Sequence, residues 1–207
     1  MAAAGRLVLV VGPSGAGKDT LIAAAKAALA DDPRYAFPRR VVTREAVAEL
    51  EDHESVNAKE FARRKALGAY ALSWEAHGLA YGLPASLRDD IAAGRIVVVN
   101  GSRAMTKAAA AMFPRTAILL IEATPEVRAR RLAGRGRETE AEIAARLGRE
   151  VPDTQAGAIR IDNSGALEEG ASRFLKALRV LAFLSELASR VSPSSSTSGA
   201  PGNSQAG

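Results

Sequence analysis

A glycine-rich loop between an apolar run and a helix-forming segment constrains this chain more than any other feature. The run Leu7–Val11 reads as a buried strand, and it leads directly into the pattern Gly-x-x-x-x-Gly-Lys over residues 12–18. This is the strand–loop–helix context of a phosphate-binding loop, in which glycines let backbone N–H groups converge on phosphate oxygens. The residues expected to bind ATP here are Gly12, Pro13, Ser14, Gly15, Ala16, Gly17, Lys18, Asp19 and Thr20.

Two side chains at the end of this loop carry distinct expectations. Lys18 is placed to bridge the β- and γ-phosphates and to follow the charge of the transferring group, so we predict that it is catalytic. The next residue is usually Ser or Thr, whose hydroxyl binds Mg²⁺, but here it is Asp19. A carboxylate is a hard oxygen ligand, so Asp19 is expected to hold Mg²⁺; alternatively, it only adds negative charge to the first helical turn.

The alternation of short apolar runs with segments of helical period predicts an α/β fold, namely a P-loop NTPase with a parallel five-stranded sheet flanked by helices. The expected strands are Arg6–Val11, Phe37–Thr43, Arg95–Asn100, Thr116–Glu122 and Ala158–Asp162. The expected helices are Asp19–Ala30, Lys59–Leu67, Ser86–Ala93, Arg103–Met112, Pro125–Ala133, Glu140–Glu150 and Leu167–Ser189.

The expected organisation is one kinase domain over residues 1–190. Residues 44–85 are polar and break the rhythm, so they form a predicted insertion that binds the acceptor. From residue 191 to 207 the composition is mostly Ser, Gly, Pro and Ala, which predicts a disordered tail.

Composition excludes several classes of function. The chain has no cysteine, so disulfides, thiolate metal sites and cysteine nucleophiles are excluded. Aromatic residues make up 4%, and no run alternates basic with stacking residues, so no nucleic-acid partner is expected. The absence of a long apolar run or a signal peptide predicts a cytoplasmic protein without a membrane partner. The net charge of +5 fits an anion-binding cleft or, as we favour, charged helix faces in solvent. A homo-oligomer is left open.

Seven arginines fall within 22 residues: Arg128, Arg130, Arg131, Arg135, Arg137, Arg146 and Arg149. A charged helix surface accounts for Arg128, Arg130 and Arg149. The glycine-containing segment 134–140 suits a lid that closes over nucleotide, and its Arg135 and Arg137 are predicted catalytic residues that stabilise the transferring phosphoryl group. Arg146 is expected to contact the substrate.

A second strand end carries a further candidate. The run Ile96–Val99 is followed by Asn100-Gly-Ser-Arg103, where many P-loop enzymes have an acidic residue. Asn100 can accept a hydrogen bond from metal-bound water and Arg103 can reach an anion, because ligands gather at the carboxyl ends of parallel strands. The alternative is a plain turn with an exposed arginine.

Over about residues 6–180 the sequence resembles the guanylate kinases. The resemblance rests on the phosphate loop and on Val41-Val-Thr-Arg44, Glu60-Phe61, the stretch 72–82, Arg131–Glu138 and Asp162-Asn-Ser-Gly165. Two departures stand out: the segment after Arg44 is acidic, and Ser73 lies where guanylate kinases have a glutamate that reads guanine. A pocket without that carboxylate leaves the donors of guanine poorly paired, so GMP is not the expected acceptor.

These departures match the ribose 1,5-bisphosphate phosphokinases of phosphonate breakdown. The chain is similar to them in the Lys18-Asp19 pair and in Thr43-Arg44, Leu72-Ser-Trp74, His77-Gly-Leu79, Tyr81-Gly82 and Val99-Asn-Gly-Ser-Arg103. The resemblance implies that ATP phosphorylates ribose 1,5-bisphosphate to 5-phosphoribosyl 1-diphosphate.

Several residue roles rest on this resemblance. The expected acceptor-binding residues are Arg44, Ser73, His77, Tyr81, Arg103 and Arg146. Asn163 either lies near adenine and binds the nucleotide, or caps a helix. Two other functions stay open: a guanylate or other nucleoside monophosphate kinase, and a non-catalytic interaction module of guanylate-kinase type.

Overall fold

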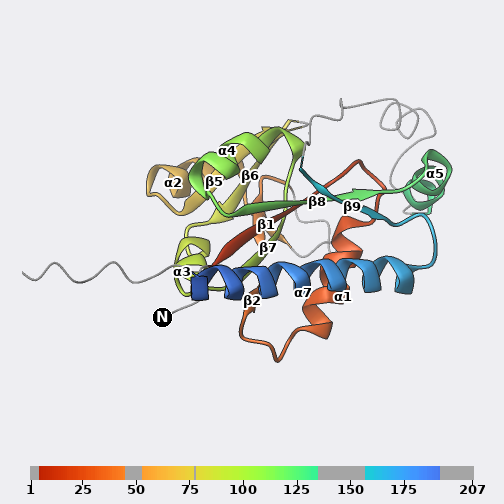
Figure 1. The fold of residues 1–207 in the computed structure, drawn as a ribbon. Coiled ribbons are helices and arrows are strands. Elements are labelled where there is room, and N and C mark those ends of the chain that lie inside the picture. Colours follow the sequence, from red (N-terminus) through yellow and green to blue (C-terminus); the bar gives the residue numbers. More distant parts are fainter. Residues whose placement is uncertain (1–4, 45–52, 77, 135–156, 192–207) are drawn as a thin grey trace, which may run out of the picture.

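Five parallel strands form the main sheet of the protein (Figure 1). The computed structural model describes residues 5–44, 53–76, 78–134 and 157–191. The strand order is β2-β7-β1-β8-β9, and every neighbouring pair is parallel. The strands are β1 (Arg6–Val11), β2 (Tyr35–Ala36), β7 (Ile96–Asn100), β8 (Thr116–Glu122) and β9 (Ile159–Asp162). The predicted fold class is confirmed.

The central strands are apolar throughout because helices cover both faces of the sheet. Val8 and Val10 of β1 pack in a cluster with α1 (Lys18–Ala28) and α7 (Leu167–Val191). Leu7 and Leu9, which point to the other face, pack in a second cluster with α3 (Leu87–Ala92) and α4 (Thr106–Met112). Two cores therefore hold the strand that leads into the glycine loop.

The second predicted strand, Phe37–Thr43, is wrong in its extent. Only Tyr35–Ala36 joins the main sheet, and Arg40–Val42 forms β3 in a different, four-stranded sheet. Pro38 lies between the two segments. A proline cannot donate to a strand ladder, so the chain leaves one sheet before it enters the other.

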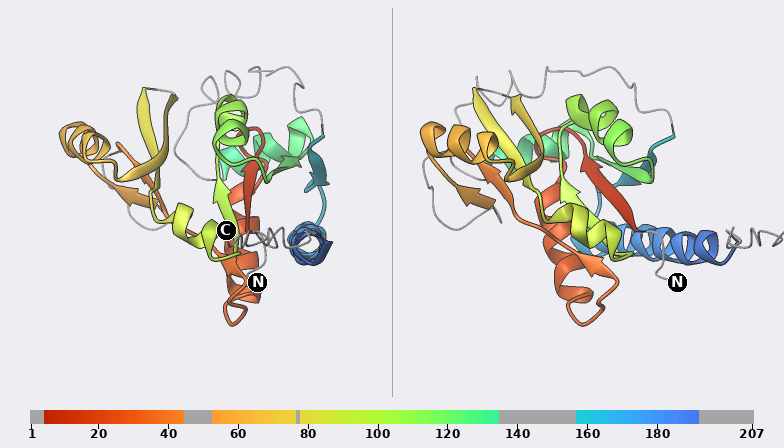
Figure 2. Two further views of the ribbon diagram at one scale, coloured as in Figure 1. Left: turned by 60° about the vertical axis from the view of Figure 1, so that its left-hand side comes forward. Right: turned by 90° about the vertical axis from the view of Figure 1, so that its left-hand side faces the viewer.

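The smaller sheet has the order β4-β3-β6-β5 and stands to one side of the main sheet (Figure 2). Its other strands are β4 (His53–Ser55), β5 (Tyr70–Ala76) and β6 (Leu79–Pro84), and α2 (Ala58–Ala66) packs on it through the stacked rings of Phe61 and Tyr70, 4.6 Å apart. It contains the described part of the predicted insertion, together with β3. Acceptor binding by this unit stays a prediction.

The remaining helices follow the predicted ranges closely. The helix α5 (Pro125–Ala133) has the predicted ends, because the Thr124 side chain accepts a hydrogen bond from the backbone N–H of Val127 and a proline begins the first turn. The predicted helix over 103–112 begins as a single 3₁₀ turn, η1 (Arg103–Met105), before α4. Most of the lid segment, the helix Glu140–Glu150 and residues 192–207 of the tail lie outside the described residues. In the described part of the chain, no helix is long and apolar enough to cross a membrane.

Candidate active site

The glycine loop connects the carboxyl end of β1 to the amino end of α1. Residues of neighbouring elements pack closely against it. A side chain at Gly12 would place its Cβ 2.2 Å from the carbonyl oxygen of Ile121. Gly17, the N-cap of α1, has a φ of 91°, and a Cβ there would lie 2.5 Å from Nδ2 of Asn163. Glycine is therefore required at both positions by the backbone path and by the packing of β8 and Asn163.

Lys18 folds back over this loop. Its Nζ donates hydrogen bonds to the carbonyl oxygens of Gly12, at 2.9 Å, and of Pro13, at 3.1 Å. These bonds hold the ammonium group beside the backbone that is predicted to bind phosphates.

Asn163 directly follows β9 and is hydrogen-bonded to the glycine loop. Its side-chain amide donates to the carbonyl oxygen of Ala16 at 2.7 Å, and the residue is only 2% exposed. A Cβ at Gly170 of α7 would lie 2.1 Å from Oδ1 of Asn163, so that glycine makes room for the amide. Asn163 thus ties β9 and α7 to the loop, while its predicted contact with nucleotide stays a prediction.

Two arginines of α5 also contact the glycine loop. Nε of Arg128 donates to the carbonyl oxygen of Ser14 at 2.9 Å, and Nη1 of Arg131 donates to that of Ala16 at 3.4 Å. Nη2 of Arg128 is buried and has no hydrogen-bond partner among the described residues. Burial also lowers the pKa of Arg128. The expectation that Arg128 lies on a solvated helix face is therefore wrong.

Arg103 brings a second positive charge to the same place. It belongs to η1, which begins three residues after the end of β7. Burial lowers the pKa of Arg103, and the nearby charge of Arg128 lowers it further. Both guanidinium groups remain protonated at neutral pH, so Arg103 adds positive charge near Arg128, which contacts the glycine loop. A region of concentrated positive charge attracts phosphate groups.

The side chain of Asp19 faces the end of β7. The Asn100 amide donates a hydrogen bond to Oδ1 of Asp19, and Nη2 of Arg40 lies 3.8 Å from the same oxygen. Oδ1 of Asn100 is buried and has no partner in the described part of the chain. Carboxylate and amide oxygens are ligands that Mg²⁺ accepts directly or through water, so this pair fits the ion chemically. Among the described residues, no group of three or more acidic or histidine side chains could hold a metal.

The smaller sheet contributes an aromatic pair. Trp74 of β5 and Tyr81 of β6 lie opposite each other, with ring centres 5.2 Å apart and planes at 10°. The guanidinium carbon of Arg40, in β3, lies 5.9 Å from the centre of the Tyr81 ring, within the range of a cation–π contact. Arg40 therefore contacts Tyr81 on one side and Asp19 on the other, and it connects the smaller sheet to α1.

No protein-family model matches this chain. A ribose 1,5-bisphosphate phosphokinase PhnN from Brucella melitensis is 46% identical over 180 residues, which cover 86% of this chain and 94% of the relative. Another from Methylobacterium radiotolerans is 49% identical over 175 residues, covering 84% and 98%. The chain belongs to the ribose 1,5-bisphosphate phosphokinase family. The family resemblance found in the sequence is confirmed.

A solved structure supports the fold of this family member independently. Guanylate kinase from Anaplasma phagocytophilum matches with a TM-score of 0.65 and 22% identity, covering 86% of this chain and 87% of that chain. At this identity the likeness shows the fold alone.

The structure brings some of the residues expected for this family together. Asp19 touches Arg40 and Asn100, Arg40 touches Tyr81, and Arg103 lies near Arg128. Ser73 is opposite Gly82, next to Tyr81 in the strand ladder. Arg44 is half-buried at the end of the first described segment. His77, Arg135, Arg137 and Arg146 lie outside the described residues, so their predicted roles remain predictions.

Sequence reasoning missed Arg40 and Arg128. A signal existed for Arg128, since it is three residues before Arg131 and four before the buried Leu132, which places all three on one helix face. For Arg40 the signal was weak. Its contacts join β3 to α1 and β6, and no local pattern specifies how the smaller sheet meets α1.

Proposed function

We propose that this chain transfers the γ-phosphoryl group of ATP to the 1-phosphate of ribose 1,5-bisphosphate. An oxygen of the 1-phosphate forms a new bond to the γ-phosphorus, the bond from that phosphorus to the β,γ-bridging oxygen breaks, and ADP leaves. The product is 5-phosphoribosyl 1-diphosphate. Membership of the family supports this reaction, and one observation carries it: two cationic side chains from different helices, Lys18 and Arg128, donate hydrogen bonds to carbonyl oxygens of the glycine loop.

The residues fit a reaction that needs positioning and charge neutralisation. The attacking phosphate oxygen is already mostly ionised at pH 7, so no strong general base is required. The loop amides and Lys18 bind the donor phosphates and hold the γ-phosphorus in place. Arg103 and Arg128 offset the negative charge where donor and acceptor phosphates approach each other.

Asp19 and Asn100 are the residues that would hold Mg²⁺, which neutralises phosphate charge when bound. Arg135 and Arg137 remain our candidates for closing over the transferring group.

Arg40 and Tyr81 are the proposed contacts for the acceptor. Each can donate to a phosphate or sugar oxygen, and the Arg40–Asp19 contact links that position to the donor side. With Ser73 in place of a guanine-reading carboxylate, this side offers no matched acceptor for the donors of guanine.

A ³¹P NMR assay with synthetic ribose 1,5-bisphosphate, ATP and Mg²⁺ tests the reaction. We expect the coupled signals of a new diphosphate to grow together with those of ADP, and Lys18→Ala to abolish both. GMP and AMP serve as competing acceptors, and GTP as a competing donor. Faster phosphorylation of GMP than of the sugar bisphosphate would overturn the proposal in favour of a nucleoside monophosphate kinase.

A further inference from the structure

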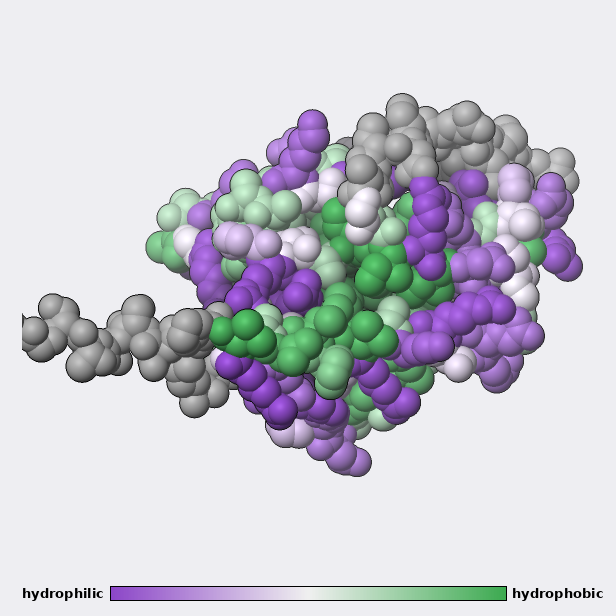
Figure 3. Space-filling view, viewed as in Figure 1, coloured by the Kyte–Doolittle hydropathy of each residue, from purple (hydrophilic) through white to green (hydrophobic). Residues whose placement is uncertain are grey.

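The carboxyl-terminal half of α7 carries an exposed apolar stripe. Its five residues are between 44% and 71% exposed, and they are Val180, Phe183, Leu184, Leu187 and Val191. In Figure 3 they form a continuous hydrophobic band along the part of α7 nearest to its carboxyl end. An exposed apolar patch of this kind is usually a surface that contacts another molecule.

The stripe is separate from the side of α7 that packs on the core. Phe174, Leu178, Leu181 and Ala182 already bury that side against α1 and the main sheet. The exposed residues recur at steps of three and four, so they share a second face that runs for about 16 Å along the helix. A helix that is apolar on opposite faces is normally covered on both.

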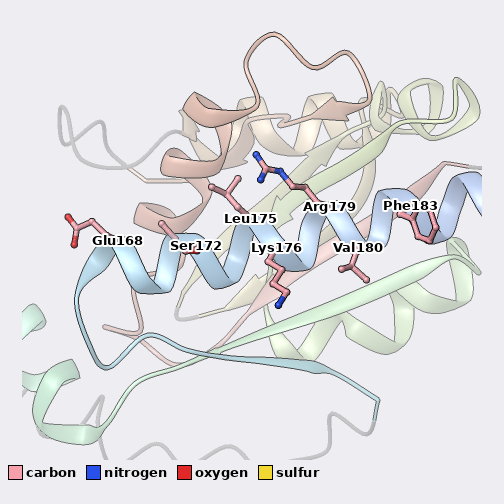
Figure 4. A pocket seen from close by; sticks show the side chains of 8 residues that line it. Glu168, Ser172, Leu175, Lys176, Arg179, Val180 and Phe183 are labelled. Atoms are coloured by element: carbon pink, nitrogen blue, oxygen red, sulfur yellow. The ribbon is translucent and has the colours of Figure 1, made fainter.

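A shallow hollow lies along the same helix (Figure 4). It measures about 660 Å³, and Val180 and Phe183 at its end belong to the stripe. All eight residues that line it come from α7, so it is an open helix surface that cannot enclose a small ligand. This shape suits another protein surface better than a metabolite.

The sixteen residues that follow α7 in this sequence are poorly suited to cover the stripe. Residues 192–207 contain no Val, Leu, Ile, Met, Phe, Trp or Tyr. A segment of Ser, Gly, Pro and Ala buries too little apolar area to shield five large side chains.

We propose that this stripe is the two-fold interface of a homodimer, in which α7 packs antiparallel against α7 of a second copy. A two-fold interface must be self-complementary, because the same surface serves both partners. Antiparallel pairing about the point between Ser185 and Glu186 places Leu184 opposite Leu187 of the second copy. The same register places Val180 opposite Val191 of the second copy.

The exposed area of the stripe is consistent with a second copy of the chain as its partner. At roughly 150–200 Å² for each whole residue, the exposed parts of the five side chains amount to about 450 Å² in one chain. Two chains would bury about 900 Å² from the stripe alone, and the surrounding rim brings the total to roughly 1,000 Å², the lower limit for a specific interface.

The charged residues near the stripe are also compatible with the proposed dimer interface. Glu186 is turned toward Arg34, whose Nη1 lies 2.9 Å from its Oε1, so this carboxylate is already paired within the chain. The basic residues Lys176, Arg179 and Arg190 are at the edges of the apolar residues, where they can stay in water. Since no opposite charges drive the contact, added salt should not weaken it.

The proposed dimer leaves both glycine loops accessible. Next to the stripe, Oγ of Ser185 accepts a hydrogen bond from Nε of Arg6, 3.1 Å away, at the start of β1. The glycine loop follows the opposite end of that strand. Monomeric variants should therefore keep the catalytic rate of the wild-type enzyme.

Sedimentation equilibrium of the full chain from about 1 to about 100 µM tests the proposal. We expect the mass of two chains for the wild type and of one chain for Phe183→Glu, with unchanged circular dichroism and turnover. Leu67→Glu is the matched control, because Leu67 is also a large apolar residue, 72% exposed, at the end of α2. A monomeric wild type at the highest concentration, or a dimeric Phe183→Glu, would overturn the proposal.

The absence of cysteine allows a second test of the register. Chains with Leu184→Cys and with Leu187→Cys are mixed and oxidised. Antiparallel pairing predicts that the mixed disulfide forms several-fold faster than either disulfide between identical chains, because only that pair is directly opposite. A preference for disulfides between identical chains would contradict the antiparallel arrangement.

Discussion

Arg128 shows how one side chain can connect a lid-side helix to the phosphate loop. Its bond to the carbonyl of Ser14 fixes the loop backbone, and its buried Nη2 has no partner among the described residues. We expect Arg128→Ala to lower kcat/KM by about 10–100-fold, the loss that follows from a charge-assisted hydrogen bond worth about 1.5–3 kcal/mol. Steady-state kinetics with varied ATP measure this.

The neighbouring Arg130 provides the control for that experiment, because it is on the same helix but exposed. Arg130→Ala should leave kcat/KM close to the wild-type value. Equal losses in both variants would mean that the effect comes from the general charge of α5 and not from the bond to Ser14.

The sequence leaves two explanations for the carboxylate of Asp19, and an Asp19→Ala variant distinguishes them. If its carboxylate and Asn100 hold Mg²⁺, Asp19→Ala should require roughly 10–100-fold more Mg²⁺ for half-maximal rate. If the carboxylate only favours the amino end of α1, the variant should lose a little thermal stability and keep its Mg²⁺ dependence. Rates across a Mg²⁺ titration, together with ATP binding measured without the metal, distinguish the two.

At the scale of elements, α2 owes part of its stability to an acidic residue that accepts hydrogen bonds from two arginines. Hydrogen bonds from Arg63 and then Arg64 lower the pKa of Glu60 to about 2, from an ordinary value of 4.5. A depressed pKa means that these pairs contribute fully above pH 4.5 and lose their contribution as the pH falls toward 2.

Glu60→Gln tests this contribution. The variant should melt at a slightly lower temperature than the wild type at pH 6, and the difference should vanish as the pH approaches 2, as followed by circular dichroism. The effect should be small and reduced by salt, because Arg63 is exposed and Glu60 and Arg64 are only half-buried. A difference that persists at pH 2 would point to a cause other than the charge of Glu60.

The elements that sequence reasoning predicted well are those with strong local signals. The apolar run of β1, the glycines after it and the Thr124-Pro125 start of α5 each specify their structure within a few residues. The strand over 37–43 failed because the apolar pattern continues while Pro38 divides it between two sheets.

The candidate site, like the fold, was predictable from the sequence where local motifs specify it. The glycine loop and Lys18 follow from a motif, and Arg103 follows from its place after a strand. Arg40 acts across the boundary between the smaller sheet and α1, and the support of the loop by Asn163 depends on the packing of β9 and α7. Both contacts join segments that are distant along the chain, so they become visible only in the fold.

At the scale of the whole molecule, the two sheets should bind their ligands in separable steps. The main sheet holds the predicted donor residues, and the smaller sheet holds Tyr81 and Arg40. A ligand at about 100 times its Kd stabilises the folded state by about 2.7 kcal/mol. For a chain of this size that corresponds to a rise in Tm of about 5–10 °C.

Thermal melts with each ligand test this separation. ATP with Mg²⁺ should raise the Tm of the wild type and of Arg40→Ala alike, whereas Lys18→Ala should lose most of the rise. Ribose 1,5-bisphosphate should stabilise the wild type and Lys18→Ala but not Arg40→Ala, because Arg40 is on the acceptor side. If ATP left the Tm of the wild type unchanged, the chain would be an interaction module rather than a kinase. If Arg40→Ala lost both responses, the contact between Arg40 and Asp19 would couple the two sheets into one binding unit.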